Sequence, residues 1–503
     1  MLAVSCQKDR VDGMTLLTEG FNGNNTKVLV NDTASTWATG DEVRINDKEA
    51  SVTVAGSTAS VSLGEEVTSP FYGVYPASIY DDNDGANYTL DLPATYTYAI
   101  SDGKQNLASP MVGYTTDNST MVFKHLTAAI TVQVVNYCGF TIQVDSIIVS
   151  SNNYKLNGEL NVTIGAGNPT VTAATTSDAD AKKVTMLFNG SSSLQVFAGD
   201  SANVQVPVLP VGVENKFTVR VVTHKVDQPA VKPIFEKEQG SKHSLARAYL
   251  GYARTTFGGL FSVSASKKVI ISQGNLQWGH NTWRFAPKQY EYVGNANNNT
   301  APTTNDENWM DLFCWGANGN TKAPNTASDY NDATDDISGT NADWTFCDIS
   351  NGGGSGRWRS LTGGTSGEWA YLIGRTNSYA KGKVCNKYGL MLFPDGYVHP
   401  TDVTAVAGIN ATGNIGWNGN DYSEADWIKM EAAGAVFLPA EGYRNNATLN
   451  YADTQGDYWT SSPSSGSSGR QIEFSASAFY YNTSWKTMTK SYGCSVRLVL
   501  DVN

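Results

Sequence analysis

The sequence has few charged residues, and it contains no long apolar run. Charged residues make up 16% of the 503 residues, and the formal net charge at pH 7 is −12. An acidic balance of this kind does not favour binding to nucleic acid or anionic lipid through bulk electrostatics. Uninterrupted apolar segments stay well short of the ~20 residues that a membrane-spanning helix needs. We therefore expect no nucleic-acid partner and no transmembrane helix.

Cysteine is also scarce. Besides Cys6, the chain has five cysteines, none in a Cys-x-x-Cys pair: Cys138, Cys314, Cys347, Cys385 and Cys494. The five histidines are scattered, so a zinc site is not expected. Four of the cysteines lie late in the chain. In an oxidising compartment they could form one or two disulfides, or they could remain unpaired core thiols.

The N-terminus carries the one targeting signal. Leu2-Ala3-Val4-Ser5-Cys6 resembles the end of a bacterial lipoprotein signal, and Gln7-Lys8-Asp9 continues it with polar residues. Met1 leaves no room for a complete signal peptide, so we expect an internal start or a trimmed signal. A lipid on Cys6 would tether the chain to the outer membrane at the cell surface without spanning it. The alternative is an ordinary cysteine in a tail.

Glycine, serine, threonine, asparagine and tyrosine are abundant, with 48 Gly and 25 Tyr. From about residue 14 to residue 250, short alternating apolar segments are separated by Gly, Asn and Asp, which is typical of antiparallel sandwiches. A chain of this length exceeds what one hydrophobic core usually serves. We expect a mainly β protein of several domains.

Four phrases in this half occur in the order found in one family. They resemble fimbrillins, the type V pilus subunits and adhesins of Bacteroidota, and they are Gly40-Asp41-Glu42-Val43, Phe71-Tyr72-Gly73-Val74-Tyr75-Pro76-Ala77, the loop from Asn106 to Met111, and the strand from Met121 to Val132. The resemblance implies two tandem transthyretin-like β-sandwiches, at residues 14–130 and 131–250. It also implies other pilus subunits as partners, joined by donor-strand exchange.

The family's assembly depends on a cleavage. A protease removes the first strand after an arginine, which opens a groove for a strand of the next subunit. Here only Arg10 and Arg44 flank the candidate first strand, and no arginine lies between it and Gly40. This departure puts the usual cleavage in doubt. Because the chain continues into a large additional domain, the resemblance places it most easily at a pilus tip.

Composition changes across a linker expected at residues 241–259. Of twelve tryptophans only Trp37 precedes it, and such a step marks a domain boundary. Beyond it we expect short strands and two helices, Glu368–Gly374 and about 424–433. Thr365 and Glu368 have the spacing of a capping box at the first helix. Strands, two helices and a glycine-rich strand set predict an α+β domain at residues 259–503.

The end of this domain resembles C-type-lectin-like domains related to formylglycine-generating enzymes. The phrases are 437–444 (Phe-Leu-Pro-Ala-Glu-Gly-Tyr-Arg), 456–462 (Gly-Asp-Tyr-Trp-Thr-Ser-Ser) and 493–500 (Gly-Cys-Ser-Val-Arg-Leu-Val-Leu). Such domains occur as displayed binding modules on bacterial surface proteins. Those enzymes use a cysteine pair near this end, whereas here Cys494 stands alone in the sequence. We therefore expect a binding module and no catalytic residues, although glycosidase-type carboxylate pairs, being spatial, stay open.

Calcium-dependent sugar binding is not favoured. The motif Glu-Pro-Asn is missing, and Trp417-Asn418-Gly419-Asn420-Asp421 only loosely echoes Trp-Asn-Asp. The loop at residues 329–343 supplies acidic oxygens at Asp329, Asp332, Asp335, Asp336 and Asp343, but not with calcium-loop spacing. We expect a solvated loop and no cofactor, with calcium as the alternative.

Aromatic residues in polar loops are the candidate ligand-binding residues. They lie among Asn, Ser and Gly, as in many faces that stack on sugars or bind proteins, and they are Trp417, Tyr422, Tyr480, Tyr481 and Trp485. The alternative is a structural role, in which several of them pack in the core.

The sequence thus predicts a lipoprotein tail at residues 1–13, two sandwiches and a lectin-like domain. The predicted function is that of a cell-surface fimbrial adhesin subunit with a C-terminal module for a glycan or protein ligand. The rivals are a free-standing glycan-binding surface lipoprotein and an exported enzyme with a lectin-like domain.

Overall fold

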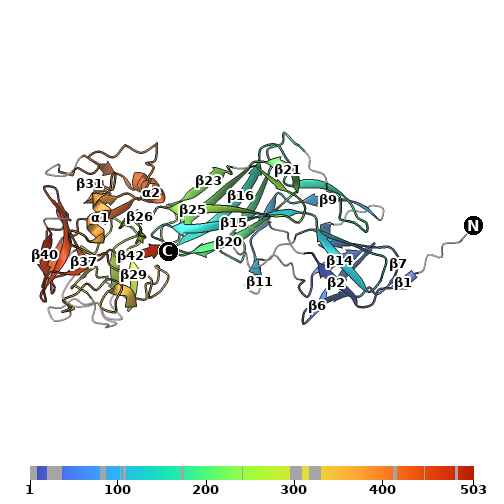
Figure 1. Cartoon of the computed structure of the whole chain (residues 1–503), viewed down its shortest axis with the longest axis horizontal. Helices are drawn as coiled ribbons and strands as arrows, with labels where there is room; N and C mark the ends of the chain where they lie inside the picture. The colour runs from blue at the N-terminus through green and yellow to red at the C-terminus, as the bar shows by residue number, and fades with distance from the viewer. Residues whose placement is uncertain are drawn as a thin grey trace, which may run out of the picture.

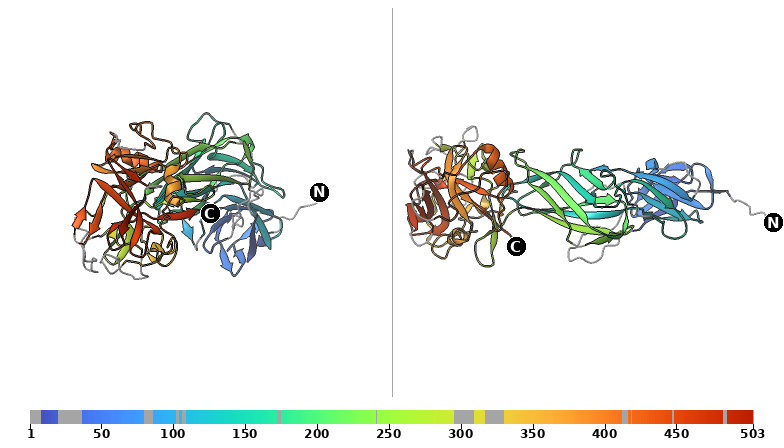
Figure 2. Two further views of the ribbon diagram at one scale, coloured as in Figure 1. Left: turned by 60° about the vertical axis from the view of Figure 1, so that its left-hand side comes forward. Right: turned by 90° about the horizontal axis from the view of Figure 1, so that it is seen from above.

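A computed structural model of the chain describes residues 8–19, 37–79, 86–101, 104–105, 109–171, 175–240, 242–294, 309–316, 330–411, 416–417, 419–446, 448–481 and 485–502. The fold is mainly β, as predicted, and the described residues contain two α-helices. Three bodies follow one another along the long axis, with the N-terminus at one far end (Figure 1). The C-terminus does not lie at the opposite end, because the last strand returns to the joint between the second and third bodies (Figures 1 and 2).

The first body is built on one eight-stranded sheet. Alternation sets its faces: in Thr120–His125, Met121 and Phe123 point into the core while Val122 is partly exposed. The strands run in the order β4 (Lys48–Ser51), β3 (Glu42–Ile45), β8 (Phe71–Tyr75), β13 (Met111–Thr115), β14 (Thr120–His125), β2 (Met14–Thr18), β6 (Thr58–Val61), β5 (Thr53–Ala55). One short pair accompanies it, β1 (Lys8–Arg10) with β7 (Glu66–Thr68). Another pair, β11 (Ile100–Ser101) with β12 (Lys104–Gln105), lies against the second body, where the Gln105 side chain donates to the Gln205 carbonyl at 2.8 Å.

A two-stranded ribbon joins the first body to the second. Strand β9 (Asn87–Leu92) pairs with β17 (Gly158–Thr163), although about seventy positions separate them in the sequence. Tyr88 and Leu160 of the ribbon form a core with Val74 and Val112, which lie on the outer face of the large sheet. The ribbon therefore fixes the first two bodies to each other.

The second body consists of two facing sheets around an apolar core. One sheet contains β10 (Thr95–Thr97), β18 (Lys183–Leu187), β16 (Ile142–Ser151), β22 (Phe217–Lys225) and β23 (Ile234–Glu238), with β19 (Gln195–Val196) beside β16. The other contains β20 (Ser201–Val208), β15 (Ala128–Tyr137) and β25 (Leu250–Gly258). A further pair is β21 (Val211–Asn215) with β24 (His243–Leu245).

The expected linker at residues 241–259 is wrong in part. It contains β24 and β25, and β25 pairs in parallel with β15 from Ala129–Leu250 to Tyr137–Gly258. The linker prediction rests on the step in tryptophan content, which marks a change of domain but gives no information on the long-range pairing that makes residues 250–258 a strand. Similarly, β10 lies within the expected first domain but pairs with β18 of the second body.

The C-terminal body combines small sheets with two helices. The helices are α1 (Glu368–Gly374) and α2 (Glu424–Ala432). One sheet holds β33 (Asp421–Tyr422), β31 (Tyr379–Val384), β32 (Lys387–Leu392) and β34 (Val436–Pro439); another holds β30 (Leu312–Phe313), β41 (Cys494–Ser495), β37 (Gln455–Pro463), β38 (Ser468–Ser475), β39 (Phe479–Tyr480) and β40 (Lys486–Thr489). The remaining strands are β26 (Phe261–Ser262), β27 (Lys268–Ile271), β42 (Val499–Val502), β28 (Leu276–Gly279), β29 (Thr282–Phe285), β35 (Tyr443–Asn445) and β36 (Thr448–Asn450).

The start of α1 differs from the prediction. Gly367, not Thr365, is the N-cap residue, and it makes no side-chain capping bond. Thr362 takes the partner role instead: its hydroxyl accepts from the Glu368 N–H at 2.9 Å, and the Glu368 carboxylate accepts from the Thr362 N–H at 3.1 Å. At α2, Ser423 and Asp426 form a reciprocal capping box.

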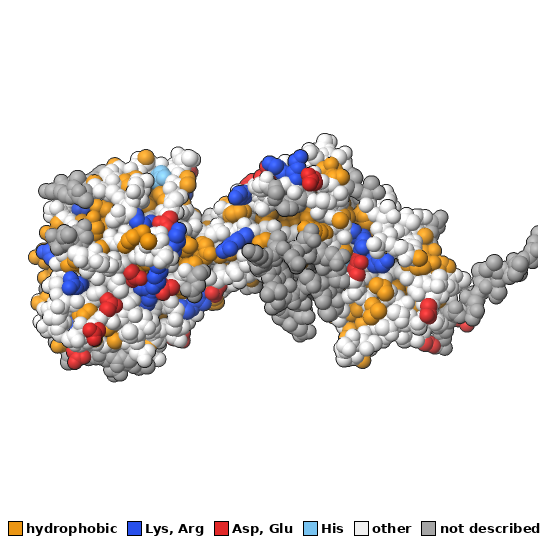
Figure 3. All heavy atoms as spheres, viewed as in Figure 1, with side chains coloured by type: hydrophobic (Ala, Val, Ile, Leu, Met, Phe, Trp, Pro, Cys, Tyr) orange, Lys and Arg blue, Asp and Glu red, His pale blue; other side chains and the backbone are white. Residues whose placement is uncertain are grey.

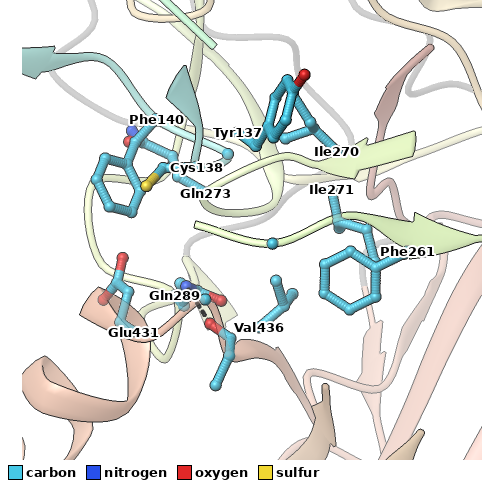
Figure 4. A pocket seen from close by; sticks show the side chains of 14 residues that line it. Tyr137, Cys138, Phe140, Phe261, Ile270, Ile271, Gln273, Gln289, Glu431 and Val436 are labelled. Atoms are coloured by element: carbon cyan, nitrogen blue, oxygen red, sulfur yellow. Dashed lines mark hydrogen bonds between the residues drawn. The ribbon is translucent and has the colours of Figure 1, made fainter. Parts of the chain in front are cut away.

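The second and C-terminal bodies meet in a tight, buried joint. Figure 4 shows Phe140 and Cys138 of the second body facing Glu431 of α2. A Cβ at Gly139 would lie 1.9 Å from the Ile271 carbonyl oxygen, so only glycine fits this close approach. The guanidinium of Arg357 adds a paired contact to the Asp200 carboxylate at 2.9 Å. The C-terminal body is therefore held in a fixed orientation on the second body.

Candidate functional site

The first strand of the eight-stranded sheet occupies an interior position. Strand β2 lies between β14, to which it is parallel, and β6, to which it is antiparallel. Met14 and Leu16 point into the core, and Leu17 is exposed on the other face. Without β2, both β14 and β6 would present an unpaired backbone edge, which is a template for another strand.

The end of β2 is bonded to the second body. The Glu19 carboxylate accepts a hydrogen bond from the backbone N–H of His125 at 2.7 Å and pairs with the guanidinium of Arg247. Arg247, which lies between β24 and β25, also donates to the His125 carbonyl at 2.7 Å. Sequence patterns could not predict this contact, because Glu19 and Arg247 lie 228 positions apart.

His125 has a structural environment. Its Nδ1 lies 3.1 Å from the Ser109 hydroxyl, and the residue is 1% exposed. Burial lowers the pKa of His125 to about 4, so the ring is neutral at pH 7. A hydrogen-bonded core histidine is what the apolar strand around it predicts.

The two arginines that flank the predicted first strand precede and follow β2 in the sequence. Arg10 belongs to β1, and Arg44 belongs to β3, where it pairs with Glu49. The predicted lipidation residue, Cys6, lies outside the described residues.

Hydrophobic side chains reach the visible surface of the C-terminal body among Lys, Arg, Asp and Glu side chains (Figure 3). Four of the five predicted ligand-binding aromatics are partly exposed on this body. Three of them, Trp417, Tyr481 and Trp485, pack with Tyr388 and Phe479 against one core cluster. These five residues are called the aromatic patch below. Trp417 stacks on Tyr388 with ring centroids 5.0 Å apart, and Phe479 lies 4.7 Å from Tyr481. Partly exposed, pre-packed rings of this kind suit stacking on a ligand.

Buried polar groups support the patch. The ammonium of Lys381 donates to the carbonyls of Ser475 at 2.8 Å and Ala478 at 3.1 Å, which fixes the turn between β38 and β39. Burial lowers the pKa of Lys381. The fourth predicted residue, Tyr480, is the neighbour of Phe479 and lies under the Lys486 ammonium, 4.4 Å from its ring centroid.

The prediction for Tyr422 is wrong. It is 2% exposed in a core with Trp427 and Phe437, and its hydroxyl donates to the Thr404 carbonyl at 3.1 Å. It follows a polar loop in the sequence, but it forms β33 and turns inward just before α2.

Two carboxylates of the acidic loop, Asp343 and Asp336, accept hydrogen bonds within the protein, whereas Asp332 and Asp335 are exposed. The buried Asp343 carboxylate accepts from the Ser360 hydroxyl at 2.7 Å and from the Gly339 N–H at 2.9 Å. Asp336 accepts from the N–H of Ser338 at 2.9 Å and from Ser462. Within the described part of the chain, no three His, Cys, Asp or Glu side chains gather as a metal site. Asp329 lies outside the described residues.

Two buried carboxyl groups meet beneath the surface of the C-terminal body. Asp311 and Glu441 are both 0% exposed. Burial raises the pKa of Glu441 well above its usual range, and the neighbouring Asp311 raises it further. Glu441 also accepts from the Ser495 hydroxyl at 2.9 Å and from the Asn275 amide at 3.3 Å. Sequence reasoning missed this pair, which is enclosed in the protein.

The cysteines of the described residues are all free thiols. Strand pairing of Phe313 with Cys494 brings Cys314 close to Cys494, a proximity that the sequence alone did not indicate. Burial raises the pKa of Cys494 well above its usual range, so its thiol is protonated and a poor nucleophile at neutral pH. The absence of catalytic residues stays a prediction.

No family model matches the chain, and no curated protein is similar in sequence. Among solved structures, one from Bacteroides uniformis, assigned by name to cell adhesion, is 13% identical with a TM-score of 0.29 and aligns 49% of this chain with 92% of its own. A fimbrial protein from Bacteroides ovatus is 11% identical with a TM-score of 0.24 and aligns 98% of this chain with 99% of its own. A fimbrial protein from Bacteroides vulgatus is 10% identical with a TM-score of 0.22, aligning 49% and 95%.

These matches are weak, because every TM-score is below 0.5. The class that the fold itself defines is a mainly β chain of three bodies in a row. Across the described residues, no helix has the length and apolar character required to cross a bilayer.

Proposed function

We propose that this chain is a cell-surface fimbrial adhesin subunit, in which the first two bodies form an assembly stalk and the C-terminal body recognises a ligand. The observation that carries the proposal is the interior position of β2, the first strand of the large sheet, between β14 and β6. Its departure would leave two adjacent edges, into which a strand of another pilus subunit could insert. Two of the fimbrillin-like phrases contribute to β3 and β8 of this sheet, and the phrase from Met121 to Val132 runs from β14 of this sheet into β15 of the second body, which agrees with the proposal.

The shape of the chain supports separate roles for the stalk and the C-terminal body. The C-terminal body lies at the end opposite the N-terminus (Figure 1), so an N-terminal anchor would leave it farthest from the membrane. Its last strand, β42, pairs with β27 inside the same body.

A second candidate is a free-standing surface protein that binds its ligand without a pilus. Two observations favour it: β2 is fully paired and latched through Glu19 to Arg247, and no arginine lies between residues 10 and 44. In this case β2 would stay in the sheet, and no donor strand would replace it.

Strand complementation separates the two candidates. The chain from residue 20 onward would be produced together with a peptide of residues 8–19, and then with the same peptide carrying Leu16→Asp, which places a charge in the core. In a pilus subunit, the first peptide should bind reversibly and be displaced by donor strands of other fimbrial subunits. If the truncated chain takes up its own peptide but no donor strand, the free-standing function is supported and the assembly proposal is wrong.

A further inference from the structure

A pocket of about 490 Å³ opens on the C-terminal body, and its lining residues are distinct from the aromatic patch. Three segments wall it: the turn after α1 at residues 375–377, the turn after β32 at residues 393–399, and the loop at residues 405–409. Every lining residue is among those the structure describes. Pockets of ~300–1,000 Å³ are the size in which proteins hold small ligands.

The pocket has an apolar interior. Phe393 stacks on Tyr397 with ring centroids 4.8 Å apart, and Ala405, Val406 and Ile409 complete this surface. Ile409 is 41% exposed, although it is a large apolar residue. An isoleucine exposed at a concave surface is suited to contact the nonpolar side of a ligand.

The two charged side chains that line the pocket, Arg375 and Asp395, both have partners within the protein, and Asp395 also pairs with the Lys268 ammonium at 3.0 Å. The guanidinium of Arg375 pairs with Asp395 and donates to the carbonyls of Leu372 at 3.0 Å and Phe393 at 3.1 Å. Asp395 also accepts from the Ser262 hydroxyl at 2.7 Å. A charged ligand would lose hydration here without gaining a free counter-charge, so the pocket favours an uncharged ligand.

His399 joins two of the walls. Its Nδ1 lies 3.3 Å from the Tyr397 hydroxyl, and its Nε2 lies 3.0 Å from the Thr404 carbonyl oxygen. These contacts connect the turn after β32 to the loop at residues 405–409. His399 therefore stabilises the shape of the pocket through both of its ring nitrogens.

The rim supplies uncommitted polar groups. Thr376 and Asn377 are exposed, and neither side chain has a hydrogen-bond partner among the described residues. A hydroxyl and an amide can donate and accept hydrogen bonds to ligand hydroxyls.

We propose that this pocket binds a neutral pyranose sugar. A pyranose ring has a nonpolar C–H face, which fits against Tyr397 and Ile409, and hydroxyl groups at its edge, which fit Thr376 and Asn377 at the rim. The proposal rests on the ligand-recognition role of the C-terminal body, and it assigns one ligand class to a site that the aromatic patch does not include.

The test is ligand-observed NMR on the full chain. The probes are methyl glycosides of glucose, galactose, mannose and N-acetylglucosamine, with N-acetylleucine amide as an apolar, non-sugar probe. At least one glycoside should bind. Ala405→Trp, which fills the pocket from an exposed position, should weaken that binding at least tenfold, and Asn377→Gly should weaken it several-fold. Val398→Ser is the matched control, because Val398 lies between lining residues but is 76% exposed.

The outcomes separate this proposal from the proposed function. Binding of the amide alone, lost in Ala405→Trp, would make the pocket a site for an apolar side chain and overturn the sugar proposal. Glycoside binding that survives Ala405→Trp but is lost in Tyr481→Ser would overturn the pocket and leave ligand recognition at the aromatic patch intact. No binding of any probe would also overturn the pocket, whereas the proposed function is tested separately with macromolecular ligands.

Discussion

The ammonium group of Lys225 in β22 donates a hydrogen bond of 2.6 Å to the Glu431 carboxylate in α2, and the two side chains are 0% and 1% exposed. Lys225 also donates to the carbonyl of Pro287 at 2.6 Å. The pair crosses the joint between the second and C-terminal bodies. A buried pair of this kind couples the folding of the two bodies, because neither charge is tolerated alone.

Glu431→Ala should destabilise the chain strongly. It leaves the Lys225 ammonium buried without its counter-charge, and loss of one partner of a buried pair costs about 3–5 kcal/mol. Chemical denaturation of the full chain measures the change in the free energy of unfolding. Lys429→Ala is the matched control on the same helix, since its pair with Asp402 is exposed and its loss should change little. Equal effects of the two substitutions would refute the coupling.

The contact of Glu19 with Arg247 should control the opening of β2. Glu19→Gln weakens charge-assisted hydrogen bonds to Arg247 and His125, each worth about 1.5–3 kcal/mol. We expect hydrogen exchange of the β2 amides, residues 14–18, to become at least tenfold faster, with the other strands of the sheet little changed.

Glu49→Gln serves as control for that experiment, because the Glu49 pair with Arg44 lies in the same sheet at β3 and β4, away from β2. If both variants exchange like the unaltered chain at residues 14–18, Glu19 does not hold the strand.

Asp457 should make stability fall as the pH rises from about 4 to about 7. Burial raises the pKa of this carboxyl to about 7, whereas an unfolded Asp has a pKa of about 3.9. Over this window the unfolded chain releases the proton and the folded chain keeps it, so the group lowers the free energy of unfolding by up to about 1.4 kcal/mol per pH unit. Above about pH 7 its contribution is constant.

Asp457→Asn should remove this contribution. Gln455 and Gln471 both donate to the Asp457 carboxylate at 3.0 Å, and an Asn oxygen can accept the same bonds. Urea denaturation at pH 4 to 8 should therefore show the variant gaining stability relative to the unaltered chain as the pH rises. Glu214→Gln, at an exposed position, should show no such trend. If the stability profiles of Asp457→Asn and of the unaltered chain run parallel with pH, Asp457 does not cause the predicted loss of stability.

Local sequence patterns predicted much of the fold. Alternating apolar segments between about residues 14 and 250 indicated the strands of the first two bodies, such as β18, β20 and β22, and the helix predicted at Glu368–Gly374 has the bounds of α1. These elements bury one face, which gives them a visible period. Strand β25 was missed because its partner, β15, lies more than a hundred residues away, and pairing over such a separation leaves no local signal.

The same contrast between local patterns and long-range contacts applies to the candidate site. Of the predicted aromatic residues, Trp417, Tyr481 and Trp485 are partly exposed, and their ligand binding stays a prediction. The same rule failed for Tyr422, which the short strand β33 turns inward. The pocket beside Tyr397 comes from three separate segments. Only the folded chain brings these segments together.

The most direct test of the central claim, that the C-terminal body recognises a ligand through its aromatic patch, is an array of glycans and mucosal proteins. The full chain should be used, because the buried Lys225–Glu431 pair joins this body to the stalk. We predict saturable binding to one ligand class, equal in calcium and in chelator, that falls at least tenfold in Trp417→Ser and Tyr481→Ser. Tyr422→Phe, which changes only a buried hydroxyl, should bind normally. No binding in either condition, or equal binding by the patch variants, would contradict the claim, and loss of binding in chelator would show that calcium takes part.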